Sequence, residues 1–313
     1  MSLQFQDLNI SRESKKNLSE IIDLILKERC CVFVGAGMSK DANYPLWEDI
    51  IEKFALDAEV LGIDLSDLKQ QSDFAEKVGF FQSKLPKKKY EEILLQLFGP
   101  DGKVRYLSNH VKIVSIPFKS YLTTNFDCCL ENAARDKNIS VIIQTYPGLD
   151  ISKIREGHFI HVHGLIDQNK TVSYQLILSS SEFHQAYQES NFLSRFLVEV
   201  FEKFTMLFIG YSLRDNELKK IIEFANKELV KASREDSFLK IGKLRIPEHY
   251  VLLHENEANE NEDIQRLGLK PIFYRGDSVR HSEVQNILET IFLLTTGTQS
   301  REPVIYKDMF EDQ

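Results

Sequence analysis

The sequence predicts an α/β fold: a doubly wound, Rossmann-like, mainly parallel sheet with a helical insertion. Short, continuous apolar segments recur along the chain, as expected for strands that are buried on both faces. Helical patterns lie between most of these segments, which is typical of parallel strands joined by crossover helices. Right-handed crossovers would then bring the loops that follow the strands to one edge of the sheet.

The N-terminal part begins with a predicted helix, because Ser11 can cap it and its apolar residues follow i, i+3, i+4, i+7 spacing: Leu18, Ile21, Ile22 and Ile25. The apolar segment that leads into Gly35 is the first predicted strand. Pro45 stands where a second helix can begin. A largely helical stretch then continues to about Phe98, where Gly-Pro-Asp-Gly at 99–102 signals a turn.

After that turn, strands and helices alternate. The predicted strands are 116–122, 140–144, 158–163, 205–210, 248–254 and 271–275, and the predicted helices are 126–136, 181–203, 214–231 and 281–295. We therefore expect one domain over 1–297 with a mainly helical insertion at about 55–110, followed by a C-terminal tail at 298–313.

Composition indicates a globular protein. The chain has 313 residues, of which 42% are hydrophobic, enough for a substantial core. A formal net charge of −8 argues against direct nucleic-acid binding, because phosphate contacts need clustered Lys and Arg. The N-terminal stretch is polar, and no segment has the length of a membrane span. We expect no membrane association and a cytoplasmic location.

The four cysteines form two adjacent pairs, Cys30-Cys31 and Cys128-Cys129, each in an apolar segment. This suits buried thiols in a reducing compartment. Neighbouring side chains point in different directions, and no C-x-x-C pair occurs, so a Cys-rich zinc site is not expected.

The first motif is VFVGAGMS at 32–39. Gly35 and Gly37 permit a sharp turn and a close backbone approach to a pyrophosphate at a following helix N-terminus. The fuller dinucleotide-binding pattern needs a third glycine, and Lys40 stands in that place. An ordinary tight turn between strand and helix is the alternative.

The second motif is TTNFD at 123–127, which closes an apolar strand before a predicted helix. Asn125 and Asp127 are thereby expected at the edge of the sheet where such folds bind ligands. An amide offers a donor and an acceptor without adding charge beside a developing cation. The alternative is that both residues only cap the helix.

The third motif contains two histidines, in HFIHVHG at 158–164. Strand alternation predicts that His161 and His163 share one face, with Gly164 ending the strand. A histidine has an intrinsic pKa near neutrality, which suits a general base, and we interpret His161 as a packed, hydrogen-bonded residue behind the site. A metal site that includes Asp167 is the alternative, but no further His or Cys cluster completes it. We expect no metal.

The fourth motif is LFIGYSLRD at 207–215, where Gly210 lets the backbone approach a ligand before a polar turn. Together the four motifs resemble the nicotinamide-ribose pocket of the sirtuin family. Where sirtuins carry Asp, Phe and Arg after the conserved proline, this chain has Leu46, Trp47 and Glu48 after Pro45. It is in this respect similar to the bacterial sirtuin-like NAD+ hydrolases, and we expect a sirtuin-like fold without a zinc module.

The resemblance implies roles for ten residues. Asn125 would orient the ribose and a water molecule, and His163 would act as a base toward a ribose hydroxyl. The residues implied to bind NAD+ are Gly35, Ala36, Gly37, Ser39, Thr124, Asp127, Gly210 and Ser212.

The same resemblance implies an activity: hydrolysis of NAD+ to nicotinamide and ADP-ribose, with NAD+ as substrate and no metal cofactor. Related bacterial proteins act in anti-phage defence by depleting NAD+ during abortive infection. Since an uncontrolled NAD+ hydrolase would be toxic, we expect a homo-oligomer held inactive until a regulatory protein partner or a phage-derived trigger acts on it. The alternatives are an NAD-dependent protein deacylase and a non-catalytic sensor of NAD+ or ADP-ribose.

Overall fold

The computed structural model describes residues 8–71, 73–154, 157–167, 169, 175–188, 191–211, 219–220, 222–227, 247–277 and 281–297. Seven strands form one sheet in the order β3-β4-β2-β1-β5-β6-β7, and every pair of neighbouring strands is parallel. The strands are β1 (Cys30–Val34), β2 (Tyr121–Thr123), β3 (Ile142–Thr145), β4 (His158–His161), β5 (Thr205–Ile209), β6 (His249–His254) and β7 (Leu269–Tyr274). The predicted parallel α/β sheet is confirmed.

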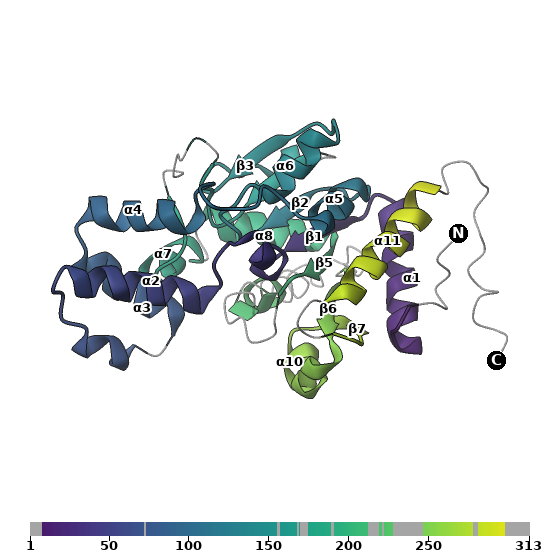
Figure 1. The fold of residues 1–313 in the computed structure, drawn as a ribbon. Helices are drawn as coiled ribbons and strands as arrows, with labels where there is room; N and C mark the ends of the chain where they lie inside the picture. Colours follow the sequence, from purple (N-terminus) through teal and green to yellow (C-terminus); the bar gives the residue numbers. More distant parts are fainter. Residues whose placement is uncertain are drawn as a thin grey trace.

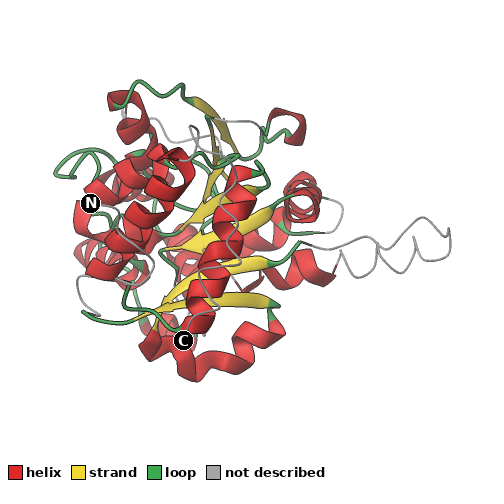
Figure 2. Ribbon diagram, turned by 90° about the vertical axis from the view of Figure 1, so that its right-hand side faces the viewer, coloured by secondary structure: helices red, strands yellow, loops and turns green. Residues whose placement is uncertain are grey.

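Helices cover both faces of the sheet (Figures 1 and 2). One face carries α1 (Arg12–Leu26), α5 (Ser108–Ser115), α6 (Cys129–Asp136) and α11 (Ser282–Thr296), and the other carries α7 (Ser180–Ala186) and α8 (Phe192–Lys203). Side chains alternate between the two faces along β1: Val32 packs against the first group of helices and Phe33 against the second. Phe33 stacks on Phe208 of β5 at 5.3 Å between ring centroids. The fold is therefore doubly wound.

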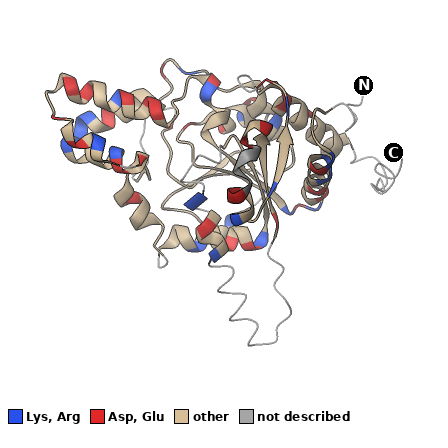
Figure 3. Ribbon diagram, turned by 90° about the horizontal axis from the view of Figure 1, so that it is seen from below, with Lys and Arg blue, Asp and Glu red and all other residues tan. Residues whose placement is uncertain are grey.

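A separate group of helices extends from one end of the sheet (Figure 1). It contains α2 (Trp47–Val60), α3 (Phe74–Lys84) and α4 (Lys87–Phe98), with a 3-10 turn over Ser66–Gln70. Phe54 stacks on Phe81 and Tyr90 to form its own core, which Phe126 and Ile166 of the sheet loops join. Basic and acidic residues both occur along these helices (Figure 3). The predicted domain boundaries stay a prediction.

Two predicted elements are wrong in their extent. The strand expected at 116–122 is confined to Tyr121–Thr123, because Pro117 has no N–H to donate to a ladder and α5 continues to Ser115. The helix expected at 181–203 is two helices, because the side chain of Asn191 accepts a hydrogen bond from the Leu193 amide at 3.0 Å and begins α8.

The remaining secondary structure lies near the sheet edge and the C-terminus, where a 3-10 turn (Glu255–Glu260) leads into α10 (Asn261–Arg266). Among the residues described, no helix combines the length and apolarity needed to cross a membrane. Ser212, most of the predicted helix 214–231 and the predicted tail 298–313 lie outside the described residues.

The chain reverses its direction of winding between β1 and β5. From β1 it proceeds to β2, β3 and β4 on one side, and it then returns to place β5 on the other side of β1. The loops after β1 and β5 therefore flank the topological switch point, where open parallel sheets bind ligands.

Candidate active site

The glycine loop after β1 is built of two 3-10 turns, Ala36–Met38 and Lys40–Ala42. The next α-helix, α2, begins at Trp47, close to the start predicted at Pro45. The Gly35 amide donates to the Ile209 carbonyl at 2.8 Å, and the Gly37 amide donates to the Gly210 carbonyl at 3.0 Å. These amides thus bind the last residue of β5 and the first residue after it.

Close approach of these two loops explains why both carry glycine. A Cβ atom at Gly35 would lie 2.6 Å from the Gly210 carbonyl oxygen, and one at Gly37 would lie 2.8 Å from it. Gly210 itself has a φ of +76°, which disfavours other residues, and a Cβ there would lie 2.5 Å from Met38 Cγ. Because these glycines lack a Cβ atom, the loops after β1 and β5 can pack closely against each other.

Asn125 is held at three of its four polar groups. Its backbone amide donates to Thr123 Oγ1 at 2.9 Å, and its backbone carbonyl lies 2.9 Å from the Nδ1 of His161. The side-chain Nδ2 donates to the Gly35 carbonyl and to Ser39 Oγ, both at 3.3 Å. Because a carbonyl only accepts, the amide orientation is fixed. The buried Oδ1 has no hydrogen-bond partner among the described residues.

The neighbours of Asn125 are engaged in the fold. Asp127 accepts a hydrogen bond from the Cys129 amide at 2.9 Å at the start of α6, the capping role considered as the alternative. Tyr211 donates to the Val34 carbonyl at 3.3 Å, so the Thr124 hydroxyl, 2.9 Å away, donates to Tyr211.

A small cavity of about 30 Å³ joins the Asn125 loop to the helical group. It brings together five residues predicted for the site: Ala36, Ser39, Thr124, Asn125 and Asp127. The other lining residues are mostly aromatic or apolar: Tyr44, Pro45, Trp47, Ile50, Phe98 and Phe126. This space is enough for a water molecule and is small for a larger ligand.

His110 of α5 is a buried residue of the site that the sequence did not reveal. Its Nδ1 accepts a hydrogen bond from the Leu107 amide at 2.9 Å, which leaves the proton on Nε2, 3.5 Å from Ser39 Oγ. Burial lowers the pKa of His110 despite the nearby charges of Asp127 and Glu131. No sequence motif surrounds it, and only the fold brings it to Ser39.

His163 does not share a face with His161, and that prediction is wrong. Strand β4 ends at His161, and the turn that follows rotates His163 toward α7. His163 Nε2 lies 2.8 Å from the Tyr187 hydroxyl, and its ring packs edge-on against Phe183. Burial lowers its pKa to about 3, so it is neutral at physiological pH. Its Nδ1 has no partner among the described residues.

His161 instead faces α6. It joins the carbonyl of Asn125 to the carboxylate of Glu131, and its side chain is fully buried. The hydrogen-bonded, packed role predicted for His161 is therefore what the geometry shows. No sequence motif pointed to Glu131, although an acidic residue among the buried residues of α6 is an unusual feature.

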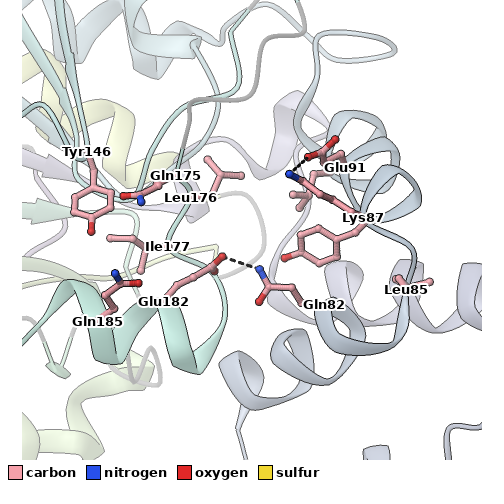
Figure 4. A pocket seen from close by; sticks show the side chains of 12 residues that line it. Gln82, Leu85, Lys87, Glu91, Tyr146, Gln175, Leu176, Ile177, Glu182 and Gln185 are labelled. Atoms are coloured by element: carbon pink, nitrogen blue, oxygen red, sulfur yellow. Dashed lines mark hydrogen bonds and ion pairs between the residues drawn. The ribbon is translucent and has the colours of Figure 1, made fainter.

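A larger cavity, of about 710 Å³, lies elsewhere, between the helical group and α7 (Figure 4). Gln82 of α3 donates to Glu182 of α7 across it at 2.8 Å. None of the ten predicted site residues lines it. Residues that could ligate a metal do not gather in threes anywhere in the described part of the chain. We place the candidate site at Asn125, because chemistry-bearing residues converge there.

Comparison with known proteins shows which proteins this chain is similar to. A family model described as a SIR2-like domain matches residues 119–272, from the residues before β2 into β7. The chain is 20% identical over 307 residues to the NAD(+) hydrolase ThsA of Cytobacillus dafuensis, covering 93% of this chain and 58% of that protein. It is 21% identical over 276 residues to the NAD(+) hydrolase ThsA of Bacillus cereus (strain MSX-D12), covering 85% and 54%.

A third relative is Defense-associated sirtuin 2 of Bacillus subtilis, 22% identical over 244 residues, covering 77% of this chain and 24% of that protein. The chain spans little more than half the length of the two hydrolases. The expected resemblance to bacterial, defence-associated sirtuin-like proteins is confirmed.

Proposed function

We propose that this chain, of which residues 119–272 match a family model described as a SIR2-like domain, hydrolyses NAD+ at the nicotinamide–ribose bond. Water adds to C1′ of the ribose as the C–N bond breaks, which gives nicotinamide, ADP-ribose and a proton. Nicotinamide leaves as a neutral base, so the ribose passes through a cation-like state that needs an oriented nucleophile more than strong acid catalysis.

One observation carries the proposal: Asn125 Oδ1 and His163 Nδ1 are both buried without a partner among the described residues. An unsatisfied buried polar atom costs about 1–3 kcal/mol, so it calls for an explanation such as a ligand contact. Asn125 Oδ1 can accept from the attacking water or a ribose hydroxyl. The neutral His163 can accept a hydrogen bond from a ribose hydroxyl at Nδ1 if its Nε2–H donates to Tyr187.

The cavity beside Asn125 suits the nicotinamide ring, because Trp47, Phe98 and Phe126 offer flat apolar surface and Asp127 offers an acceptor for a carboxamide N–H. Its volume of about 30 Å³ requires the segment that carries Tyr44 and Trp47 to move before the ring can bind. This supports a latent enzyme that a partner or a phage-derived trigger opens. We propose a defence effector that depletes NAD+ in infected cells.

Product analysis tests the reaction. The protein is incubated with NAD+ in ¹⁸O-water, with and without the products of neighbouring genes, and the expected products are nicotinamide and ADP-ribose carrying one ¹⁸O atom at C1′. Formation of O-acyl-ADP-ribose from an acetylated peptide would instead establish the deacylase. Binding of NAD+ without turnover under every condition would establish the sensor.

A further inference from the structure

A buried pair of side chains lies behind the loop that carries Asn125. His161 is the last residue of β4, Glu131 lies in α6, and their side chains are each about 1% exposed. His161 Nε2 lies 2.7 Å from Glu131 Oε1, and His161 Nδ1 lies 2.9 Å from the Asn125 carbonyl oxygen. The imidazole therefore connects a carboxylate to the backbone of the predicted catalytic residue.

The proton positions follow from the partners. A carbonyl oxygen has no proton to give, so Nδ1–H donates to Asn125. Glu131 accepts from Nε2–H when His161 is protonated. Burial alone would lower the pKa of His161, but the charge and hydrogen bond of Glu131, the Asn125 carbonyl and the charge of Asp127 together raise it. Both ring nitrogens of His161 thus face oxygen acceptors, an arrangement that suits a protonated imidazole paired with the Glu131 carboxylate.

Burying two charged side chains in a protein core is energetically costly. Removing both charges from water costs several kcal/mol per ion, and well-packed apolar side chains of similar volume are often as stable or more so. Glu131 Oε2 adds to this cost, because it is buried without a partner among the described residues. Stability alone is thus a weak reason for this pair to stand behind Asn125.

Its geometry supplies a stronger reason. Thr123 holds the Asn125 amide, the glycine loop holds Nδ2, and His161 holds the carbonyl. Resting on the proposed NAD+ hydrolysis, we propose that His161 and Glu131 are positioning residues that fix the Asn125 peptide and so direct Oδ1 at the reacting ribose. Neither residue touches the reacting atoms in this role.

Matched substitutions of two buried histidines test the proposal. His161→Gln removes the imidazole that joins Glu131 to the Asn125 carbonyl, an arrangement called the clamp below. His249→Gln changes a histidine of β6 that is 2% exposed and accepts a hydrogen bond from the Met206 amide. Misplacing a catalytic group by about 1 Å costs about 100-fold in rate, so kcat of His161→Gln should fall about 100-fold while KM stays within about threefold. His249→Gln should keep the wild-type kcat.

A second measurement is independent of activity. Hydrogen exchange of the peptide that spans 124–128 should accelerate in His161→Gln and stay at the wild-type rate in His249→Gln. Wild-type exchange in folded His161→Gln would overturn the clamp, even if the protein hydrolysed no NAD+. An accelerated exchange with no NAD+ hydrolysis by the wild type would keep the clamp and reject the proposed reaction. If His161→Gln fails to fold, Glu131→Gln takes its place, and unchanged kcat and exchange in that variant would overturn the proposal.

Discussion

Asn125 Nδ2 donates to the Gly35 carbonyl at 3.3 Å, and this contact joins the loop after β2 to the glycine loop after β1. It fixes which end of the amide faces the protein, because Gly35 can only accept at that atom. Oδ1 is thereby left without a hydrogen-bond partner among the described residues. The side chain of Asn125 therefore does not cap α6. The neighbouring Asp127 accepts the hydrogen bond from the Cys129 amide at the start of that helix.

Replacing Asn125 tests this orientation through stability. Asn125→Asp places a carboxylate oxygen opposite the Gly35 carbonyl, so two acceptors face each other, and we expect a loss of about 1–3 kcal/mol in the free energy of unfolding. Asn125→Ala removes the unpartnered Oδ1 together with two long hydrogen bonds and should change stability by less than about 1 kcal/mol. Denaturant titration measures both variants. Equal stability of the two would mean that the amide is oriented the other way.

The loop contact at the switch point predicts a costly substitution at Gly210. Gly210→Ala combines a positive φ with a Cβ atom 2.5 Å from Met38 Cγ, so it should destabilise the protein by about 2–4 kcal/mol. Gly62→Ala is the matched control, because Gly62 has a φ of +69° and no atom within 4 Å of the added Cβ. It should cost only about 1 kcal/mol. Similar losses in both variants would show that the loops do not interlock.

The hydroxyl of Tyr187 should orient the His163 ring, and a substitution that keeps the volume of the side chain can test this. Tyr187→Phe removes the hydroxyl 2.8 Å from His163 Nε2 but retains the ring that stacks on Phe183. If NAD+ is hydrolysed as proposed, kcat should fall about tenfold, since a hydrogen bond contributes about 1 kcal/mol or more to orienting the base. Steady-state kinetics provides the measurement, with the thermal midpoint as the control for folding. An unchanged kcat would remove His163 from the mechanism.

Burial of neutral His163 predicts sensitivity to acid. Its folded pKa of about 3 lies below the unfolded value near 6.5, so the unfolded chain binds the proton first. Stability should therefore fall as the pH drops from 6.5 toward 3, by up to about 1.4 kcal/mol per pH unit from this group. Between pH 6.5 and 5, His163→Gln should show a shallower decline than the wild type. An identical slope would contradict the neutral, buried state.

His161 predicts the opposite dependence. Because its pKa is raised in the folded protein, its contribution is complete below the unfolded pKa and is lost as the pH rises through the folded pKa. The stability difference between the wild type and Glu131→Gln should therefore be larger at pH 6 than at pH 9. Denaturant titrations at the two pH values measure it, and a difference that grows with pH would show that His161 is not protonated in the fold.

Much of the fold could be predicted from local patterns. Continuous apolar segments predicted seven strand regions, and right-handed crossovers predicted that their loops meet at one edge. The missed details depend on single residues. Pro117 delays β2, and Asn191 divides a long helical pattern because its side chain competes for a backbone amide.

The site was less predictable, because contacts between distant segments decide it. The turn after His161 cannot be read from alternation, which continues through His163 in the sequence. His110 reaches Ser39 across 71 residues, and Glu131 reaches His161 across 30. The sequence motifs predicted where the chemistry gathers, but the residues that hold Asn125 became apparent only from the folded chain.

The most direct test of the central claim is NAD+ consumption by the wild type and by folded Asn125→Ala, measured with the neighbouring-gene products present. We predict that the wild type releases nicotinamide and ADP-ribose in equal amounts and that Asn125→Ala is slower by about 100-fold or more. Equal rates of NAD+ loss in the two proteins would contradict the account.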